Sequence, residues 1–309
     1  MKKRLFWILK LGITVFLIAW LVERVDWKVV FHLVQGLSVP LLVLYVGFQL
    51  AGTLISARKW QYLSQIQGFS FSITTGFFQY LTGAFINNFL PSTIGGDAYR
   101  TLWLGRQGDR WTAFSVVLYD RISGLLVLFL LASFGFLVIP WDVWLRSPWL
   151  IILAGSTFSL TAVLCVGLWA SQRIFQWLLR FVEHFAASFG ALLRRLENFA
   201  EARVYRKSIG YGMGFAVVGV ALNNYMLFQS LGAELHFFSF FGVIFLATLV
   251  ANIPLSVNNI GIKEWSYIFF FGLVGVSGEL AVTAVLLSRA IQLLLSLGAL
   301  PGYWRQRKE

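Results

Sequence analysis

The sequence predicts an all-α, polytopic membrane protein, and three observations support this. Of the 309 residues, 58% are apolar and only 12% are charged, about half the charged fraction of an ordinary soluble domain. The mean hydropathy is +0.75. Apolar runs of about 20 residues, the length of a membrane-spanning helix, recur along the chain. So few charges could not cover a soluble globule, which excludes a cytosolic enzyme, a disordered chain and a disulfide-rich secreted domain. We expect one integral membrane domain over residues 1–309.

The first expected span covers residues 5–22 and follows three basic residues. It resembles a signal peptide, but Trp20 and Glu23 stand where a small-residue cleavage site would be needed. We therefore expect a retained helix with its N-terminus in the cytoplasm. Five further runs have the length of a full span and bring the total to about six: 39–57, 111–139, 149–170, 208–231 and 279–300.

Two further apolar segments are interrupted. Residues 76–90 form a short run that breaks at Pro91 and at Gly95-Gly96, while 237–254 ends at Pro254 and is followed after a break by 265–276. Proline removes a backbone donor and glycine permits unusual backbone conformations. Freed backbone groups cannot face lipid, so we expect both breaks to be buried or to line one wet cavity.

Loop charges predict the topology. Five basic clusters, at 2–4, 58–59, 100–110, 173–207 and 305–308, hold 18 of the 25 Lys and Arg residues. All five can lie in the cytoplasm, as the positive-inside tendency requires, only if 76–90 enters and leaves on the same side. The second broken element then starts outside, either as a re-entrant hairpin or as two short crossings. Two broken elements of opposite orientation fit an inverted repeat with a site at the midplane. We expect a multi-pass protein of the bacterial inner membrane with both termini in the cytoplasm.

The longest hydrophilic stretch, 171–207, has apolar residues spaced by three or four and charges on the other face. This spacing predicts an amphipathic helix or helix pair on the cytoplasmic membrane surface. It is either a connector shielded by lipid headgroups or a surface that collects anionic lipids.

Ionisable residues inside membrane segments are costly and commonly functional. At the first break, Gly95 and Gly96 would let a phosphate approach backbone N–H groups at the start of a half-helix, Arg100 would add charge, and Asp97 would cap the helix. A plain turn with a cytoplasmic Asp97–Arg100 pair is the alternative.

Further candidates lie on the spans and in the second break. Asp120 and Arg121 are neighbours that point about 100° apart on a helix, so Arg121 could reach an acid elsewhere or a lipid phosphate. Lys263 and Glu264 are the counterparts of Asp97 and Arg100 in the second break. Arg289 lies on the last span, with Glu264 or Glu279 as a possible partner; structural salt bridges are the alternative reading for both span arginines.

Three motifs in order carry a family resemblance: Asn88-x-x-Pro91-x-x-x-Gly95-Gly96-Asp97-x-x-Arg100, then Asp120-Arg121-x-x-Gly124, then Pro254 followed by Gly261-x-Lys263-Glu264. They resemble the lysylphosphatidylglycerol synthase transmembrane-region family, also called flippase-like. The resemblance implies movement of a headgroup-modified lipid between leaflets. Stand-alone relatives are associated with hopanoid biosynthesis and lipid-bound sugars. Aminoacyl-transferring members carry a separate soluble catalytic domain, for which this sequence has no room, so synthase activity is not expected.

The second motif departs from the family pattern, which usually reads Gly-Gly-Ile-Gly-x-Arg-Glu. Here Asn258 and Asn259 replace two glycines, and Lys263 replaces the arginine. Lysine keeps the charge but loses the two-pronged geometry of a guanidinium. The departure implies either a changed lipid or a weakened site.

These observations predict a transporter or flippase-like protein that moves or binds a polar phospho- or glycolipid, with anionic or headgroup-modified lipids as its partners. The alternatives are a membrane enzyme, for which Asp97, Asp120 and Glu264 are the only plausible acid set, or an accessory subunit of a lipid-modifying enzyme. No metal-ligand spacing or nucleotide loop occurs, so no cofactor is expected, and the basic residues read as loop charge rather than a nucleic-acid surface. The expected headgroup site comprises Asn88, Pro91, Gly95, Gly96, Asp97, Arg100, Asp120, Arg121, Asn258, Asn259, Gly261, Lys263, Glu264 and Arg289.

Overall fold

The computed structural model describes residues 2–89, 94–139, 148–169, 192, 194–199 and 201–298. This part of the chain is all-helical, as predicted. Its elements, in order, are α1 (Lys2–Arg24), α2 (Trp27–Gln35), α3 (Val39–Ile66), α4 (Ile73–Phe89), α5 (Gly95–Leu104), α6 (Arg110–Gly135), a 3₁₀ turn (Phe136–Val138), α8 (Pro148–Trp169), α11 (Ala202–Phe215), a π-helix (Ala216–Leu222), α12 (Asn223–Ser230), α13 (Phe237–Ala251), a 3₁₀ turn (Val257–Asn259), α14 (Ile262–Gly272) and α15 (Gly278–Leu297). Pro91 and residues 171–191 lie outside the described residues.

Four long helices are apolar enough to cross a membrane: α3, α6, α15 and the continuous helix Ala202–Ser230 that joins α11 to α12. The other two predicted spans correspond to α1 and α8, which are helices of 23 and 22 residues. The prediction of an all-α membrane protein is therefore confirmed.

Helix α3 continues well past the predicted end of its span, to Ile66. Arg58 and Lys59 therefore lie within the helix rather than in a loop, and Lys59 is only 5% exposed. Burial of this ammonium is compensated by the carboxylate of Asp120, 3.0 Å away. Lys59, which was predicted to be a loop charge, instead lies inside the bundle.

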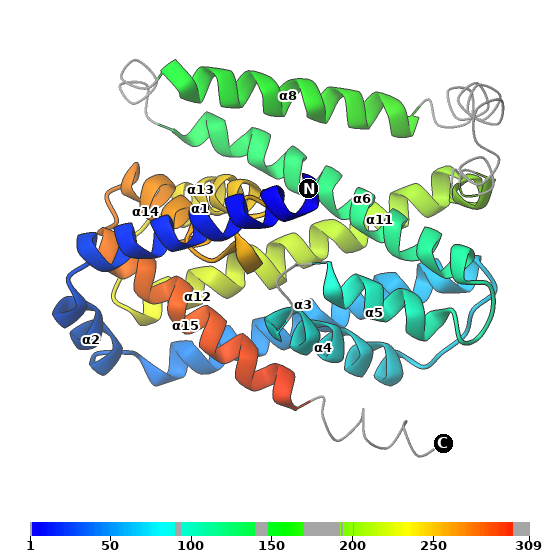
Figure 1. Ribbon diagram of the computed structural model, residues 1–309, viewed down its shortest axis with the longest axis horizontal. Helices are drawn as coiled ribbons and strands as arrows, with labels where there is room; N and C mark the ends of the chain where they lie inside the picture. The colour runs from blue at the N-terminus through cyan, green and yellow to red at the C-terminus, as the bar shows by residue number, and fades with distance from the viewer. Residues whose placement is uncertain are drawn as a thin grey trace.

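The two broken elements form hairpins of opposite orientation. Helices α4 and α5 pack together, and the α3–α4 connection and the α5–α6 turn lie at the right-hand end of Figure 1. Helices α13 and α14 also pack together, and their connections to α12 and α15 lie at the left-hand end. With 11 residues, α14 is about 16 Å long, roughly half of a hydrocarbon core. Its length favours the re-entrant hairpin over two short crossings.

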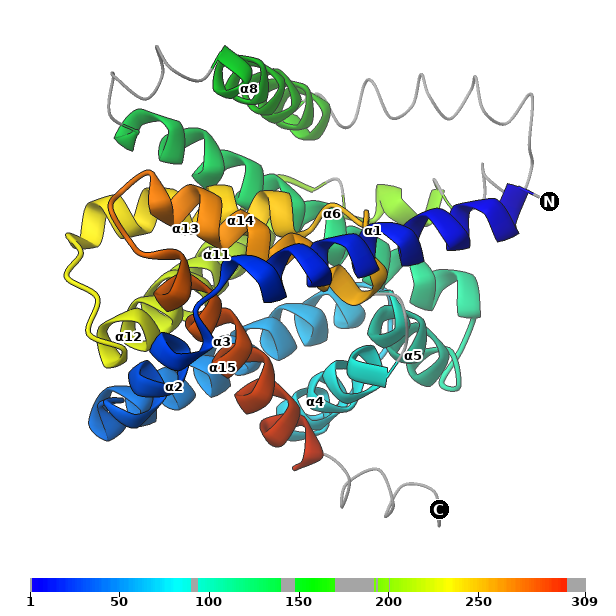
Figure 2. The ribbon, with the colours of Figure 1, turned by 60° about the vertical axis from the view of Figure 1, so that its left-hand side comes forward.

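Among the described helices, α13 is the most deeply buried, and it anchors the hydrophobic core. Its Phe240 packs beside Phe228 of α12 and Phe271 of α14, and the last two rings are stacked with centroids 4.3 Å apart. In Figure 2, α13 and α14 run side by side through this region, and α4 and α5 lie in another part of the bundle. The core thus fixes the second hairpin against the spans that flank it.

Helix α3 and the π-helix approach each other closely through glycine. A Cβ added at Gly52 would lie 2.5 Å from the Cα of Gly219, so neither position accommodates a larger side chain. Small residues allow such close approach in membrane proteins, where packing drives helix association. The π-helix brings Ala216 and Val220 to the wall of the cavity described below.

Candidate functional site

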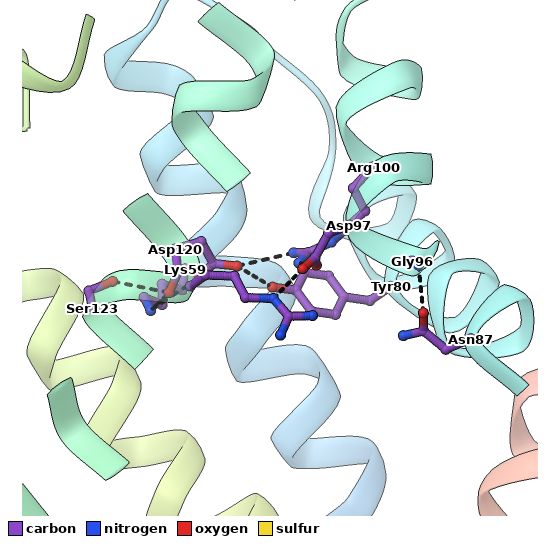
Figure 3. A network of polar contacts seen from close by, with 9 residues as sticks. Lys59, Tyr80, Asn87, Gly96, Asp97, Arg100, Asp120 and Ser123 are labelled. Carbon is purple, nitrogen blue, oxygen red and sulfur yellow. Dashed lines mark hydrogen bonds and ion pairs between the residues drawn. The ribbon is translucent and has the colours of Figure 1, made fainter. Parts of the chain in front are cut away.

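A charged cluster joins four helices at the first hairpin (Figure 3). Asp120 of α6 is its centre: one carboxylate oxygen lies 3.0 Å from Nζ of Lys59, and the other accepts hydrogen bonds from Nη1 of Arg100 at 3.1 Å and from the Tyr80 hydroxyl at 2.8 Å. The Asp120 side chain is 9% exposed. A buried carboxylate with three donors is fully paired, so Asp120 holds α3, α4 and α5 against α6.

Asp97 is the second acid of the cluster and bridges two arginines. Its Oδ1 lies 2.5 Å from Nη2 of Arg100, and its Oδ2 accepts a hydrogen bond from Nε of Arg121. Asp97 therefore does not cap α5, which differs from the expectation. Instead, Oδ1 of Asn87 accepts the backbone N–H of Gly96 at 2.6 Å, because the end of α4 lies directly beside the start of α5.

Gly96 serves the packing of the hairpin. A Cβ at this position would lie 2.6 Å from the carbonyl oxygen of Gly83 in α4 and 2.9 Å from Nδ2 of Asn87. Its N–H group donates to Asn87, so Gly96 contributes to the contact between α4 and α5, and it also lines the cavity described below. Gly95 is buried in the same first turn of α5.

The three cations of the cluster have different surroundings. Arg100 is buried, and its guanidinium lies 4.3 Å from the ring centroid of Tyr80, a distance typical of cation–π contact. Lys59 is buried against Asp120. The side chain of Arg121 is 40% exposed. Among the described residues, three cations face two acids, so these five side chains carry one surplus positive charge, and Arg121 is the most exposed of the three cations.

The cluster opens into a cavity of about 400 Å³. Lys59, Arg100, Asp97, Asp120 and Arg121 form its charged side. Its apolar wall comprises Leu125, Val127, Leu128, Phe215, Val220 and Phe245. A charged patch beside an apolar wall suits an amphipathic ligand, because headgroup and hydrocarbon can each meet a matching surface.

A second polar cluster stabilises the break between α13 and α14. Arg289 of α15 donates from Nε to Glu264 at 2.9 Å and from Nη2 to the carbonyl of Asn259 at 3.0 Å, with a longer bond of 3.4 Å from Nη1 to the carbonyl of Asn258. Glu264 also accepts the N–H of Gly261 at 2.7 Å. Of the two partners expected for Arg289, Glu264 is the one used. These bonds favour the structural role for Arg289.

The backbone of this break is left-handed at three positions: φ is 50° at Asn258, 55° at Asn259 and 86° at Gly261. Glycine adopts such values without strain, and asparagine tolerates them better than most residues. Asparagine can therefore occupy the two positions where the family pattern has glycine. Lys263 follows directly, and its Nζ lies 3.2 Å from the hydroxyl of Ser288.

The two clusters repeat one arrangement. Asp97 pairs with Arg121, 24 residues further on, and Glu264 pairs with Arg289, 25 residues further on. In each pair an acid in the first turn of the second half-helix meets an arginine on the following span. This correspondence fits the inverted repeat expected from the two breaks.

A second cavity, of about 640 Å³, brings the breaks together. Asn87 and Asn88, at the end of α4, share its wall with Asn258 and Asn259. It adjoins the first cavity, since Asn87, Phe215 and Val220 line both. The expectation that both breaks line one space therefore holds for Asn88, Asn258 and Asn259. Gly95 and Gly261 are not among the lining residues, and Pro91 lies outside the described residues.

Two members of the charged cluster, Lys59 and Tyr80, were not among the predicted site residues. Lys59 could have been found by following the helical pattern past residue 57, because Trp60 and Leu63 continue a buried face. Tyr80 gave no such signal, since a tyrosine within an apolar run is ordinary. Its role depends on the approach of α4 to α6, which sequence spacing does not encode.

The fold and this site define a class: a helical membrane protein with two opposed hairpins whose breaks meet at polar cavities. Residues 7–299 match the family described as Lysylphosphatidylglycerol synthase TM region, and the chain belongs to this family. It is 22% identical over 267 residues to UPF0104 membrane protein MJ1595 of Methanocaldococcus jannaschii, covering 80% of this chain and 79% of that protein.

A UPF0104 membrane protein of Methanothermobacter thermautotrophicus is 25% identical over 236 residues, covering 68% of this chain and 69% of the relative. No solved structure matches the chain. The family match identifies a membrane protein of a lipid-related family and extends over both hairpins, so both belong to the part of the chain that the family shares.

Proposed function

We propose that the protein binds the anionic headgroup of a membrane lipid between the two hairpins and passes it from one leaflet to the other. The observation that carries this proposal is the surplus positive charge of the cluster beside an apolar-walled cavity of about 400 Å³. The headgroup would meet Arg121 while the acyl chains stay against hydrocarbon. We further propose that both termini, and the end of the bundle that carries the α5–α6 turn, face the cytoplasm of the cell membrane.

Arg121 is the residue we assign to the headgroup. Arg100 is buried between two carboxylates, and Lys59 is held by both the side chain and the backbone carbonyl of Asp120. Arg121 shares Asp97 with Arg100 and has a side chain that is 40% exposed. A phosphate at this point would complete the charge balance of the cluster. Placing an arginine within a membrane helix costs about 2.5–3.5 kcal/mol on insertion scales, and such a contact would supply a reason for that cost.

The arrangement of the acids favours transport over the enzyme alternative. An enzyme of the kind considered above would bring Asp97, Asp120 and Glu264 together on one substrate. Asp97 and Asp120 lie in the first cluster and Glu264 in the second, and each is paired with a cation. Carboxylates held in this way are suited to fixing helices and arginines in place.

Reconstitution into liposomes tests the proposal. A fluorescent anionic phospholipid in both leaflets is bleached from outside with a membrane-impermeant reductant, and the loss of protected signal reports translocation. We expect the wild-type protein to accelerate this loss and Arg121→Gln to slow it about tenfold, the effect of about 1.4 kcal/mol. The matched control is Arg106→Gln, because Arg106 is exposed in the α5–α6 turn and lines neither cavity. Equal rates of signal loss in liposomes with and without the protein would refute transport.

Native mass spectrometry of the gently extracted protein gives an independent test. A co-purifying lipid of defined headgroup supports the proposal. A substrate and product pair would instead indicate a membrane enzyme, and a stoichiometric protein would indicate an accessory subunit of a lipid-modifying enzyme.

A further inference from the structure

The second cavity has an unusual lining. Seven asparagines and two glutamines contribute to its wall, together with Lys263 and Arg289, and none of its lining residues is an aspartate or glutamate. An amide side chain offers both donors and an acceptor but no charge. Hydroxyl groups also donate and accept, so an amide-lined space complements a hydroxyl-rich, uncharged group.

Several of these amides are available to a ligand. Asn223 and Asn252 donate to backbone carbonyls of the protein. By contrast, the side chains of Gln49, Asn258, Asn259 and Gln292 make no hydrogen bond to the described residues, although all four line the cavity. In a membrane protein, polar groups without protein partners require water or a ligand. They come from α3, the second break and α15, and so surround the space from several sides.

The charge of the cavity is positive. Arg289 is paired with Glu264, but Lys263 has the Ser288 hydroxyl at 3.2 Å and the Tyr267 ring at 5.6 Å as its contacts, with no carboxylate at ion-pair distance among the described residues. An ammonium group on a ligand would meet Lys263 without a counter-charge, which is costly where the dielectric constant is low. A phosphate would be attracted to the same place.

We propose that this cavity selects a headgroup in which a phosphate carries an uncharged, hydroxyl-rich group such as a sugar or polyol. Lys263 binds the phosphate, and the amides of Asn258, Asn259, Gln49 and Gln292 bind the hydroxyls. Headgroups that carry an ammonium are disfavoured. This inference rests on the proposed function and names the class of lipid that the protein accepts.

Binding measurements on the full chain in phosphatidylcholine nanodiscs test the selectivity. The probes are phosphatidylinositol, whose phosphate carries a hydroxyl-rich ring, and phosphatidylserine, which has the same net charge but bears an ammonium; both have identical acyl chains. Native mass spectrometry gives the bound fraction of each lipid. We expect phosphatidylinositol to bind about tenfold more tightly, a difference of about 1.4 kcal/mol.

Two sets of variants assign the preference to the amides. The double change Asn258→Gly with Asn259→Gly keeps a backbone that favours positive φ and removes two amides. We expect the preference to fall to about twofold, with phosphatidylserine binding unchanged. Gln292→Leu removes an amide from exposed helix surface without touching the break, so it tests the same point if the glycine variant fails to fold.

The outcomes separate this inference from the proposed function. Equal affinity for the two lipids, or a preference for phosphatidylserine, would overturn the selectivity while leaving lipid binding intact. An undiminished preference in both the glycine variant and Gln292→Leu would also overturn it. Failure of the wild-type protein to bind either lipid would refute the proposed function as well.

Discussion

Asp97 and Asp120 divide the three cations of the charged cluster between them. Asp120 neutralises Lys59 and one side of Arg100, and Asp97 joins the other side of Arg100 to Arg121. Removing a partner from a buried ion pair leaves an uncompensated charge, whereas removing an exposed charge costs little. The residues of one cluster should therefore separate into two groups by the effect of their mutation on stability.

Asp120→Asn should destabilise the protein severely, because it leaves two buried cations facing a neutral amide. Loss of one member of a buried pair typically costs about 3–5 kcal/mol. Thermal unfolding in detergent, followed by tryptophan fluorescence, measures the effect, and Lys59→Met added to Asp120→Asn should recover part of it. Arg121→Gln is the control and should remain close to the wild-type melting temperature. An equal loss for Arg121→Gln would mean that Arg121 is structural.

Asp109 caps helix α6 outside the membrane segments and provides a pH-dependent contribution to stability. Its carboxylate accepts hydrogen bonds from the Thr112 hydroxyl and backbone N–H, both at 2.8 Å, and pairs with Arg195 at 3.1 Å. The hydrogen bonds from Thr112 lower the pKa of Asp109 below its usual value. Because the folded-state pKa is depressed, the contribution is complete above the unfolded pKa of about 3.9 and is lost as the pH falls through the folded value.

Asp109→Ala should therefore lower the free energy of unfolding by about 1 kcal/mol at neutral pH, the usual value of an N-cap. The difference from wild type should shrink as the pH falls below about 4. Asp109→Asn keeps an accepting oxygen without a titrating proton, so the difference in stability between Asp109→Asn and Asp109→Ala should not vary with pH. A pH-independent deficit in the alanine variant would contradict the assignment.

At the scale of elements, each hairpin depends on how closely its two half-helices approach. Gly96→Ala should force α4 and α5 apart, because its new Cβ would lie 2.6 Å from the Gly83 carbonyl oxygen. Overpacking of this kind costs about 1–3 kcal/mol. Gly155→Ala in α8 is the matched control, since a Cβ there meets nothing within 4 Å. The melting temperature of Gly96→Ala should therefore fall below that of the wild type, whereas that of Gly155→Ala should not.

The orientation of the hairpins can be tested by labelling. In a Cys165→Ala background, single cysteines at Ser70 and Arg106 should react with an impermeant thiol reagent from one side of the membrane. Cysteines at Glu234 and Ser277 should react from the other, because these exposed positions lie in connections at the opposite end of the bundle (Figure 1). If the cysteines that replace Arg106 and Ser277 were labelled from the same side, one of the broken elements would have to cross the whole membrane.

At the scale of the whole molecule, the fold class and the two breaks were predictable, because membrane insertion requires long apolar helices and penalises unpaired backbone. The pairing of Glu264 with Arg289 was among the alternatives that the sequence offered. The buried face that carries Lys59 could be followed in the sequence, but its pairing with Asp120 could not, and Tyr80 was not predictable, since both contacts depend on where α3 and α4 meet α6. The close contact of Gly96 with α4 likewise required the position of Gly83.

The opposed hairpins also have an electrical consequence. In the proposed topology each broken element reaches only part of the way across the membrane, and residues of both breaks line one cavity. The membrane voltage would then fall over a shorter distance there than across the full bilayer. Carrying one elementary charge through 100 mV involves about 2.3 kcal/mol. Most of the electrical work of moving a lipid with one net negative charge would therefore be done inside the cavity. A potassium diffusion potential imposed on proteoliposomes should therefore speed its passage in one polarity and slow it in the other, while a headgroup of zero net charge should pass at an unchanged rate.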